Sequence, residues 1–388
     1  MRIRSIEVNN FKSLVGFRLD LSKFSCLIGL NGVGKSTILQ FIDFLGQQAR
    51  GDIQGWLEKR NWKARELSSH LKSGTTVPLK RALTFRVEVV DQDQQNITWT
   101  GEFSPSRLQC TKETVTTADA ELKVRSSHYS IMEHGQARDS GKILFTFEGS
   151  ILSQLRKEVL PESLERFKKF LLSTESLDML TPERLRQRTK VSNGSLGHGG
   201  RHLSAFVFEL GKTGRLKLAR RLREVYAQLD HVYAKSIQAG WKQLLVREEF
   251  GGAKLLTEAT HVNDGTLRLL AILAELASNH EFLLFDEIEN GINPELVEFV
   301  TDALVEAKQQ VMVTTHSPMI LNYLEDATAG KGVIYVYKTR LGHTQAIPFF
   351  SIPSLKKKLS VMGPGEAFVD TSLSNVDEEI AAMAREGV

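Results

Sequence analysis

Gly29-Leu-Asn-Gly-Val-Gly-Lys-Ser36 is the stretch that decides the fold. It matches the pattern G-x-x-x-x-G-K-[ST], and it stands between an apolar run (residues 24–28) and apolar side chains at helical spacing (residues 38–45). Glycines let backbone N–H groups turn inward around phosphate oxygens, and the N-terminus of a following helix adds a favourable dipole. The stretch therefore predicts a strand, a phosphate-binding loop and a helix, in an α/β fold.

The residues of this loop are predicted to contact a nucleoside triphosphate. Lys35 can reach the outer phosphates, and the Ser36 hydroxyl can ligate Mg2+. The predicted cofactor-binding residues of the loop are Gly29, Asn31, Gly32, Val33, Gly34, Lys35, Ser36 and Thr37. The pattern thus predicts ATP and Mg2+ as cofactors.

A second motif is Phe282-Leu-Leu-Phe-Asp286-Glu287, an apolar strand that ends in two acids. We expect Asp286 to hold Mg2+, directly or through water, and Glu287 to act as the general base for an attacking water. Apolar strands often end in acids, so this motif is weak alone. Combined with the phosphate loop it is a strong indication of ATP hydrolysis.

Two further candidates depend on the first two motifs. His316 follows an apolar strand (residues 311–315) and could bond a γ-phosphate or the attacking water, although a lone histidine is more often structural. Asn263-Asp264-Gly265-Thr266 begins a predicted helix, where N–H groups can bind an anion. The alternative is that Asn263 or Asp264 is only the N-cap of that helix.

The remaining patterns outline the other elements. Residues 83–147 read as short strands in an antiparallel meander, with residues 142–147 as the last strand. Residues 151–188 and 202–240 read as helices, and the four glycines of residues 192–200 predict a mobile loop between them. Later strands are expected at 243–250, 253–258, 311–315 and 333–337, with helices over 266–277 and from Pro294.

Composition limits the class of protein. The 388 residues are 41% hydrophobic and 25% charged, which is an ordinary globular balance. No apolar run approaches the roughly 20 residues needed to cross a bilayer, no secretory signal begins the chain, and only two cysteines occur. These features predict a cytoplasmic protein without a membrane partner.

Charge is distributed unevenly along the chain. The net charge is +4, but residues 151–240 hold 17 Lys and Arg against 9 Asp and Glu, while residues 366–388 hold six acids and one arginine. The basic middle could attract a polyanion such as DNA, or it could consist of solvated helix faces. The sequence leaves these two interpretations open.

The order of these motifs resembles the ATP-binding-cassette (ABC) head of the RecF and SMC superfamily. It is most similar to small predicted ATPases of the AbiEii and OLD-like type, which carry DGT-x-R and DEIENG-x-x-P. Those patterns are matched here by residues 264–268 and 286–294, with a D-loop at residues 289–293. Asn9-Asn-Phe-Lys-Ser also looks like the opening phrase of such heads, which implies that Lys12 lies near the phosphates.

The resemblance implies a P-loop fold of ABC type, with a mixed central sheet, an antiparallel β subdomain and an inserted helical lid. The expected parts are residues 1–150, a basic lid at 151–240, a second part of the head at 241–350 and a tail at 351–388. It also implies a homodimer, or a higher oligomer, that encloses ATP between two heads. Asn263, Asp264 and Gly265 are then expected to face the γ-phosphate bound by the other subunit, provided that Asp264 turns away from it.

Departures from the family narrow the expected function. No long coiled coil interrupts the head, and the 72 residues after His316 are too few for the nuclease domain of OLD-type proteins. We therefore expect a switch or sensor ATPase that controls a separate effector, a nuclease or a toxin, in bacterial antiphage defence. The alternative is a RecF-like DNA-binding repair ATPase that uses the basic residues Lys212, Arg215, Lys217, Arg220, Arg221 and Arg223. A transporter motor is disfavoured by the atypical signature.

Overall fold

The computed structural model describes residues 1–71, 82–177 and 180–386, and it divides into two compact units. Unit 1 contains Met1–Thr174, Ala327–Val361 and Asp370–Val388, whereas unit 2 contains Glu175–Asp326 and Met362–Val369. The phosphate loop therefore belongs to unit 1, and the motifs between residues 263 and 316 belong to unit 2. In the described part of the chain, no helix is both long and apolar enough to span a membrane.

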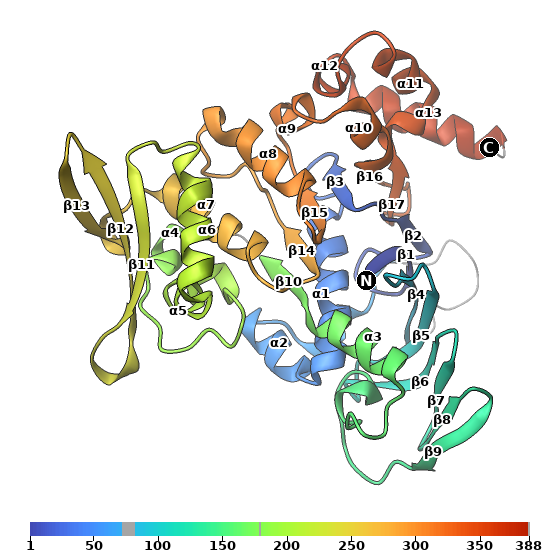
Figure 1. The fold of residues 1–388 in the computed structure, drawn as a ribbon. Coiled ribbons are helices and arrows are strands. Elements are labelled where there is room, and N and C mark those ends of the chain that lie inside the picture. Colours follow the sequence, from blue (N-terminus) through green and yellow to red (C-terminus); the bar gives the residue numbers. More distant parts are fainter. Residues whose placement is uncertain (72–81, 178–179, 387–388) are drawn as a thin grey trace. The chain divides into compact units, whose positions relative to one another are not determined.

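Unit 1 is built on an eight-stranded antiparallel sheet in the order β2-β1-β4-β5-β6-β7-β8-β9 (Figure 1). Its strands are β1 (Arg2–Asn9), β2 (Phe17–Asp20), β4 (Leu83–Val90), β5 (Asn96–Ser104), β6 (Gln109–Thr116), β7 (Ala120–Arg125), β8 (His128–Glu133) and β9 (Gln136–Lys142). From β4 to β9 each strand pairs with the next along the chain. The expected antiparallel meander is therefore confirmed.

The last strand of the meander lies earlier than the sequence predicts. A strand over residues 142–147 is wrong: β9 ends at Lys142, and Leu144 is 82% exposed. His134 and Gly135 both have positive φ, 48° and 78°, as a tight hairpin turn requires. This turn pairs a polar strand with β8, so backbone pairing rather than apolar content determines the strand.

A smaller group of strands in unit 1 carries the phosphate loop. Strand β3 (Phe24–Ile28) is buried and pairs parallel with β16 (Val333–Lys338), which pairs antiparallel with β17 (Thr344–Pro348). Helix α1 follows the loop, and its Phe41 and Phe44 pack on Phe11 with ring centroids 5.3 and 5.7 Å away. The helices of unit 1 are α1 (Lys35–Arg50), α2 (Ile53–Lys59), α3 (Glu162–Leu172), α10 (Asp326–Gly332, whose first residue is in unit 2), α11 (Pro353–Leu359) and α13 (Leu373–Glu386).

Unit 2 contains a parallel pair of buried strands and a three-stranded antiparallel sheet. Strand β14 (Phe282–Phe285) pairs parallel with β15 (Gln310–Thr314), and β11 (Leu229–Ser236), β12 (Lys242–Phe250) and β13 (Ala253–Glu258) pair in chain order. Strand β10 (Thr174–Leu177) stands at the unit boundary. The helices of unit 2 are α4 (Pro182–Leu185), α5 (Leu203–Glu209), α6 (Gly211–Arg223), α7 (Asp264–Leu276), α8 (Val297–Val305), α9 (Pro318–Asn322) and α12 (Pro364–Val369).

The helical interpretation of residues 202–240 is correct only in part. Helices α5 and α6 pack against β11 and β12 (Figure 1), but residues 229–236 form strand β11. Likewise, residues 151–188 contain β10 between α3 and α4. Val232 and Ala234 of β11 are buried on one face, a period of two that a helix does not have. Expected strands at 243–250 and 253–258, and the helix over 266–277, are confirmed.

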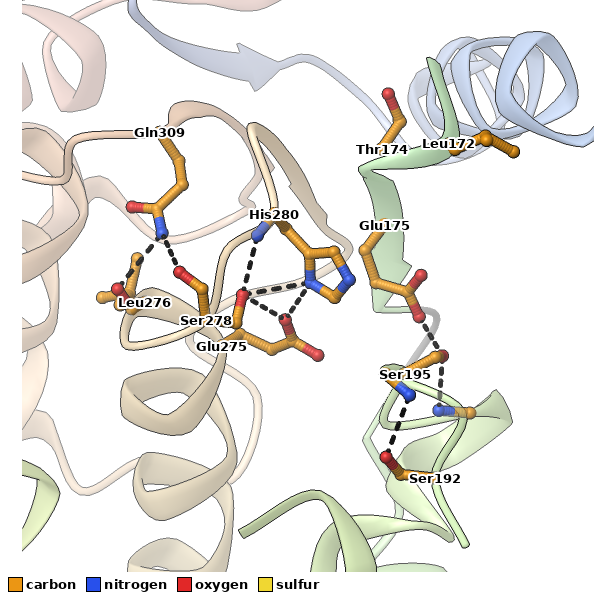
Figure 2. A network of polar contacts seen from close by, with 12 residues as sticks. Leu172, Thr174, Glu175, Ser192, Ser195, Glu275, Leu276, Ser278, His280 and Gln309 are labelled. Carbon is orange, nitrogen blue, oxygen red and sulfur yellow. Dashed lines mark hydrogen bonds and ion pairs between the residues drawn. The ribbon is translucent and has the colours of Figure 1, made fainter. Parts of the chain in front are cut away.

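The glycine-rich segment at residues 192–200 is hydrogen-bonded to neighbouring elements, and its expected mobility stays a prediction. The Ser192 hydroxyl donates to Glu209 Oε2 (2.5 Å), and the Ser195 hydroxyl donates to Glu175 (Figure 2). Leu196 is fully buried. Its glycines allow tight turns, which bring these side chains onto their acceptors.

Candidate functional site

The phosphate loop is shaped by glycines that no other residue could replace. Gly34 has φ 112°, and an added Cβ would lie 2.3 Å from Thr344 Oγ1. Gly29 has φ 142°, and its Cβ would lie 2.2 Å from the carbonyl oxygen of Val336. The loop is therefore pressed against β16 and β17 with no space for a side chain at either position.

Lys35 lies at the centre of this loop. Its ammonium group donates to the carbonyl oxygens of Gly29 (2.9 Å) and Leu30 (3.0 Å), and the residue is only 6% exposed. The ammonium of Lys35 is thus held within the loop by two of the loop's own carbonyl groups. The position fits the predicted contact with the outer phosphates of a nucleotide.

The start of α1 fits an anion equally well. The N-cap is Gly34, which has no side chain to occupy the first N–H groups, and the first turn contains no acid. Ser36, in this first turn, is exposed. A helix start of this kind attracts phosphate through its N–H groups and its dipole.

Thr344 and Ser13, which were not among the predicted site residues, support the phosphate loop. Thr344 Oγ1 donates to the carbonyl of Val33 (2.7 Å) and lies 2.7 Å from the Ser13 hydroxyl, while the Thr344 backbone N–H donates to the Ser13 carbonyl. Thr344 is fully buried. No sequence pattern could have found it, because it reaches the loop from the opposite end of the chain.

Lys12 is half-buried, and neighbouring side chains hold its ammonium group. Its ammonium donates to Gln40 Oε1 (2.9 Å) on α1 and lies 3.1 Å from the centroid of the Trp62 ring. This position is one turn beyond the start of α1, next to the loop rather than in it. A direct contact of Lys12 with phosphate stays a prediction.

In unit 2, Thr314 organises the two acids that follow β14. Its hydroxyl donates to Asp286 Oδ1 (2.6 Å) and accepts the backbone N–H of Glu287 (2.8 Å). Because β14 and β15 are parallel neighbours, their carboxyl ends bring Asp286, Glu287 and Thr314 to one edge. Thr314 was not among the predicted site residues, although its place in Thr314-Thr-His-Ser could have indicated it.

Glu287 has an unusual backbone conformation. Its φ is 47°, in the left-handed region that non-glycine residues rarely adopt. Such strain persists only where neighbouring contacts enforce it, and it is concentrated at functional sites. The Asn290 side chain approaches Glu287 Oε2 at 3.4 Å and would orient the carboxylate.

His316 is attached to the D-loop through its backbone. Its N–H donates to Glu289 Oε1 (2.7 Å), while the residue itself is exposed at the end of β15. His316 thus follows β15 at the edge where Asp286 and Glu287 follow β14, and a contact of its imidazole with the γ-phosphate or the attacking water stays a prediction.

The signature segment begins α7, and the side chains of Asn263 and Asp264 have defined partners there. Asn263 is the N-cap, since its side chain accepts the Thr266 N–H at 2.8 Å. Asp264 turns sideways and pairs with Arg186 at 2.5 Å. The carboxylate is therefore neutralised by an arginine that sequence reasoning did not single out, and the expected repulsion of a phosphate is reduced.

Arg268 connects the DGT-x-R segment to the DEIENG segment. Its guanidinium donates to the carbonyl of Asn290, and an added Cβ at Gly291 would lie 2.9 Å from its Nε atom. Burial lowers the pKa of this guanidinium, although Asp264 acts in the opposite direction. Arg268, Asp286, Glu287 and Asn290 also line one small cavity. The signature helix and the D-loop are thus in direct contact within unit 2.

The opposite end of α7 is fixed by a buried carboxylate. Glu275 Oε2 lies 2.7 Å from His280 Nδ1, and Gln309 donates to the carbonyls of Leu276 (3.1 Å) and Ser278 (3.4 Å), as Figure 2 shows. Glu275 is fully buried. These bonds hold the turn between α7 and β14, so they fix where the acids begin.

Three of the six basic residues of the α6 cluster make contacts within unit 2. Arg215 donates to the Phe208 carbonyl (3.0 Å), Arg221 pairs with Glu224 (3.0 Å), and Arg223 pairs with Asp230 (3.0 Å). Half of the cluster therefore stabilises unit 2 itself, and Lys212, Lys217 and Arg220 remain exposed on α6.

Two family models match parts of this chain. Residues 1–180 match the family described as "AAA ATPase domain", and residues 143–322 match "AAA domain, putative AbiEii toxin, Type IV TA system". Together these two matches span residues 1–322, and both models describe AAA-type ATPase domains. No curated protein matches this sequence.

Solved structures show the same fold. An SMC head bound to the C-terminal winged-helix domain of ScpA is 14% identical, with a TM-score of 0.55, over 89% of this chain and 98% of that one. An SMC head with an extended coiled coil, bound to the C-terminal domain of ScpA from Pyrococcus furiosus, is 14% identical, with a TM-score of 0.52, over 93% and 98%. The expected P-loop fold of ABC type is thereby confirmed.

Proposed function

We propose that this ATPase binds ATP with Mg2+, hydrolyses it, and forms an ATP-enclosing homodimer that switches a separate effector protein. The observation that carries the proposal is the acid pair Asp286 and Glu287, organised by Thr314, with Glu287 in a strained conformation. The lysine-centred glycine loop in unit 1 supplies the phosphate cradle.

Each residue then has a chemical role. Glu287 accepts the proton of a water that attacks the γ-phosphorus, and the bond from that phosphorus to the bridging oxygen breaks to release ADP. Lys35 and the α1 amides stabilise charge on the phosphates. Ser36 and Asp286 would hold Mg2+, which neutralises charge on the phosphate oxygens. His316 would orient the water or the γ-phosphate.

The dimer is proposed from the family and from the signature. Asn263 caps α7 and Arg186 neutralises Asp264, which leaves the helix start suited to the γ-phosphate of a second subunit. Arg268 connects this signature to Asn290 and thus to Glu287. Binding of the second subunit's γ-phosphate at the start of α7 would therefore affect the position of Glu287, the proposed catalytic base.

The effector role rests on the comparisons. The similar SMC heads are described as bound to a separate protein, ScpA, and one matching family is described as a putative toxin of a type IV toxin–antitoxin system. We propose that the effector is a nuclease or toxin encoded next to this chain, and that the system acts in antiphage defence. Co-purification of the neighbouring gene product with Glu287→Gln, but not with Lys35→Ala, is the expected result.

The central test uses two variants and one control. Lys35→Ala is expected to lose ATP binding in calorimetry, and Glu287→Gln is expected to bind ATP, to stop turnover and to elute as a dimer with ATP and Mg2+. Glu298→Gln, at an exposed position on α8, should behave like the unmodified chain. A strictly monomeric Glu287→Gln protein with bound ATP would refute the enclosed dimer, and normal ATP affinity in Lys35→Ala would refute the site.

A further inference from the structure

The hairpin of β12 and β13 presents an unusual edge. Gly251 and Gly252 form its two-residue turn with φ of 56° and 89°, the geometry of a type I′ turn. Phe250 and Ala253 close this turn, and the register continues through Arg247 opposite Leu256 to Leu245 opposite Glu258. In such a hairpin the closing pair is hydrogen-bonded, so Lys254, Leu256 and Glu258 direct their backbone N–H and C=O groups away from β12.

Apolar side chains on this edge are uncovered on both faces. Helices α5 and α6 pack on β11 and β12, where Val232, Leu244 and Val246 are buried. Beyond these helices, Leu255 is 53% exposed on the same face of the sheet, and Leu256 is 52% exposed on the other. In the order β11-β12-β13, strand β13 is at the edge of the described sheet. An edge strand with exposed leucines on both faces is a template for another strand.

The sequence of β13 is complementary to itself. Lys254, Leu256 and Glu258 share one face, and Leu256 is equidistant in sequence from the opposite charges. An antiparallel pairing of two β13 strands centred on Leu256 places Leu256 opposite its own copy and Lys254 opposite Glu258 of the second copy. Opposite charges and apolar pairs at facing positions both stabilise antiparallel strands.

We propose that β13 is a two-fold contact between two copies of this chain, formed without nucleotide and additional to the ATP-enclosed dimer. The shared contact would continue the sheet β11-β12-β13 into the second copy. A two-fold contact uses the same edge on both subunits and closes on itself, so it does not lead to open-ended fibres.

The charges around Glu258 are compatible with this contact. Glu258 pairs with Arg188 at 2.5 Å on its own subunit, and its side chain keeps 22% of its surface exposed. Lys254 is exposed and faces Glu249 of β12 in the register. The lysine of the second copy would therefore join an existing acid–arginine pair, which favours this register over one that places two lysines together.

Single cysteines provide the test. The two native cysteines, Cys26 and Cys110, are buried, so a cysteine introduced at an exposed position is the only rapidly reacting thiol. With a short bis-maleimide and no nucleotide, Leu256→Cys should give a cross-linked dimer. Leu216→Cys, at a 47% exposed position on α6, is the matched control and should give little.

Two further measurements fix the assignment. The cross-link should persist in a Lys35→Ala background, because this contact does not depend on ATP, and adding Lys254→Glu should reduce its yield several-fold. Equal yields from Leu256→Cys and Leu216→Cys, a strict requirement for ATP, or indifference to Lys254→Glu would each overturn the proposal. Failure here would leave the Glu287→Gln dimer test unaffected, so the two proposals fail independently.

Discussion

At the scale of single residues, Arg268 joins two motifs that are separate in the sequence. Its guanidinium donates to the Asn290 carbonyl, and the Asn290 side chain lies 3.4 Å from Glu287 Oε2. Gly291 beside it has φ of 68°, which favours glycine, and an added Cβ would lie 2.9 Å from Arg268 Nε. Arg268 is thus a positioning residue that acts on the proposed base through Asn290.

Arg268→Met keeps the length of the side chain but removes this donor. We expect kcat for ATP hydrolysis to fall about tenfold or more, since small displacements of reacting groups cost this much, while the Kd for ATP changes less than twofold. Arg268→Lys should recover part of the rate. Arg86→Met, on the surface of β4, controls for the loss of an arginine. A raised Kd with an unchanged kcat would contradict the positioning role.

Glu113 provides a prediction about pH. It is fully buried and accepts from Trp99 Nε1 (2.8 Å), the Ile151 N–H (3.1 Å) and the Ser150 hydroxyl. Burial raises the pKa of its carboxyl above the ordinary 4.5, although the three donors act in the opposite direction. A raised pKa in the folded state means that its stabilisation is present below the unfolded value and is lost as the pH rises through the folded value.

Relative to Glu113→Gln, the unmodified chain should therefore lose free energy of unfolding as the pH rises from 4.5 through the raised pKa. The loss should be about 1.4 kcal/mol for each unit by which the pKa is raised. Urea unfolding at a series of pH values measures the difference between the two proteins. If the free energies of unfolding of the two proteins change with pH in the same way, the pKa of Glu113 is not raised.

At the scale of secondary structure, the phosphate loop depends on a strand more than 300 residues later in the chain. Strand β17 begins with Thr344, whose hydroxyl donates to the Val33 carbonyl (2.7 Å) directly before Gly34. Two strands and the start of α1 therefore define the loop together. Since β17 is short and polar, its pattern alone did not predict it.

Thr344→Val should remove this support while it preserves the shape of the side chain. We expect a roughly tenfold higher Kd for ATP, because the loss of one buried hydrogen bond is worth about 1 kcal/mol or slightly more. Thr301→Val is the matched control, since Thr301 is also buried and donates to a backbone carbonyl at 2.8 Å, on α8. Both variants should melt at similarly lowered temperatures, but only Thr344→Val should bind ATP more weakly. Equal affinities in calorimetry would refute the support role.

At the scale of the whole molecule, residues 151–240 carry an excess of positive charge that could bind DNA. How many of these basic residues can contact phosphates decides between a switch protein and a DNA-binding protein. Three of the six basic residues on α6 are engaged with the chain itself, through Phe208, Glu224 and Asp230. Lys212, Lys217 and Arg220 are the cluster members left to contact phosphates. At about −0.9 per contact, three contacts limit the slope of log K against log salt to about −2.7.

We therefore expect weak DNA binding with a slope no steeper than about −3, and Lys212→Ala/Lys217→Ala/Arg220→Ala should bind more weakly still, with a shallower slope. Fluorescence anisotropy with duplex DNA at several salt concentrations measures it. Arg223→Ala should instead lower the melting temperature, since it breaks the pair with Asp230. A much steeper slope that the triple variant abolishes would favour the RecF-like alternative.

Much of this protein could be predicted from its sequence, because the deciding signals are local. The phosphate loop needs glycines at fixed spacing, β14 needs a continuous apolar run, and α7 needs a cap and an apolar period. Such features depend on neighbours within a few residues, so the amino-acid sequence alone predicts roles for Gly34, Lys35, Asp286, Glu287 and Asn263.

Only the tertiary structure decided the contacts between distant segments. Thr344 beneath the loop, Arg186 on Asp264 and Arg268 on Asn290 join residues that are 22 to 311 positions apart. The same holds for β9 and β11, which exist because a partner strand satisfies their backbone groups. Pairing and burial depend on which segments meet in space, and no short window of sequence contains that information.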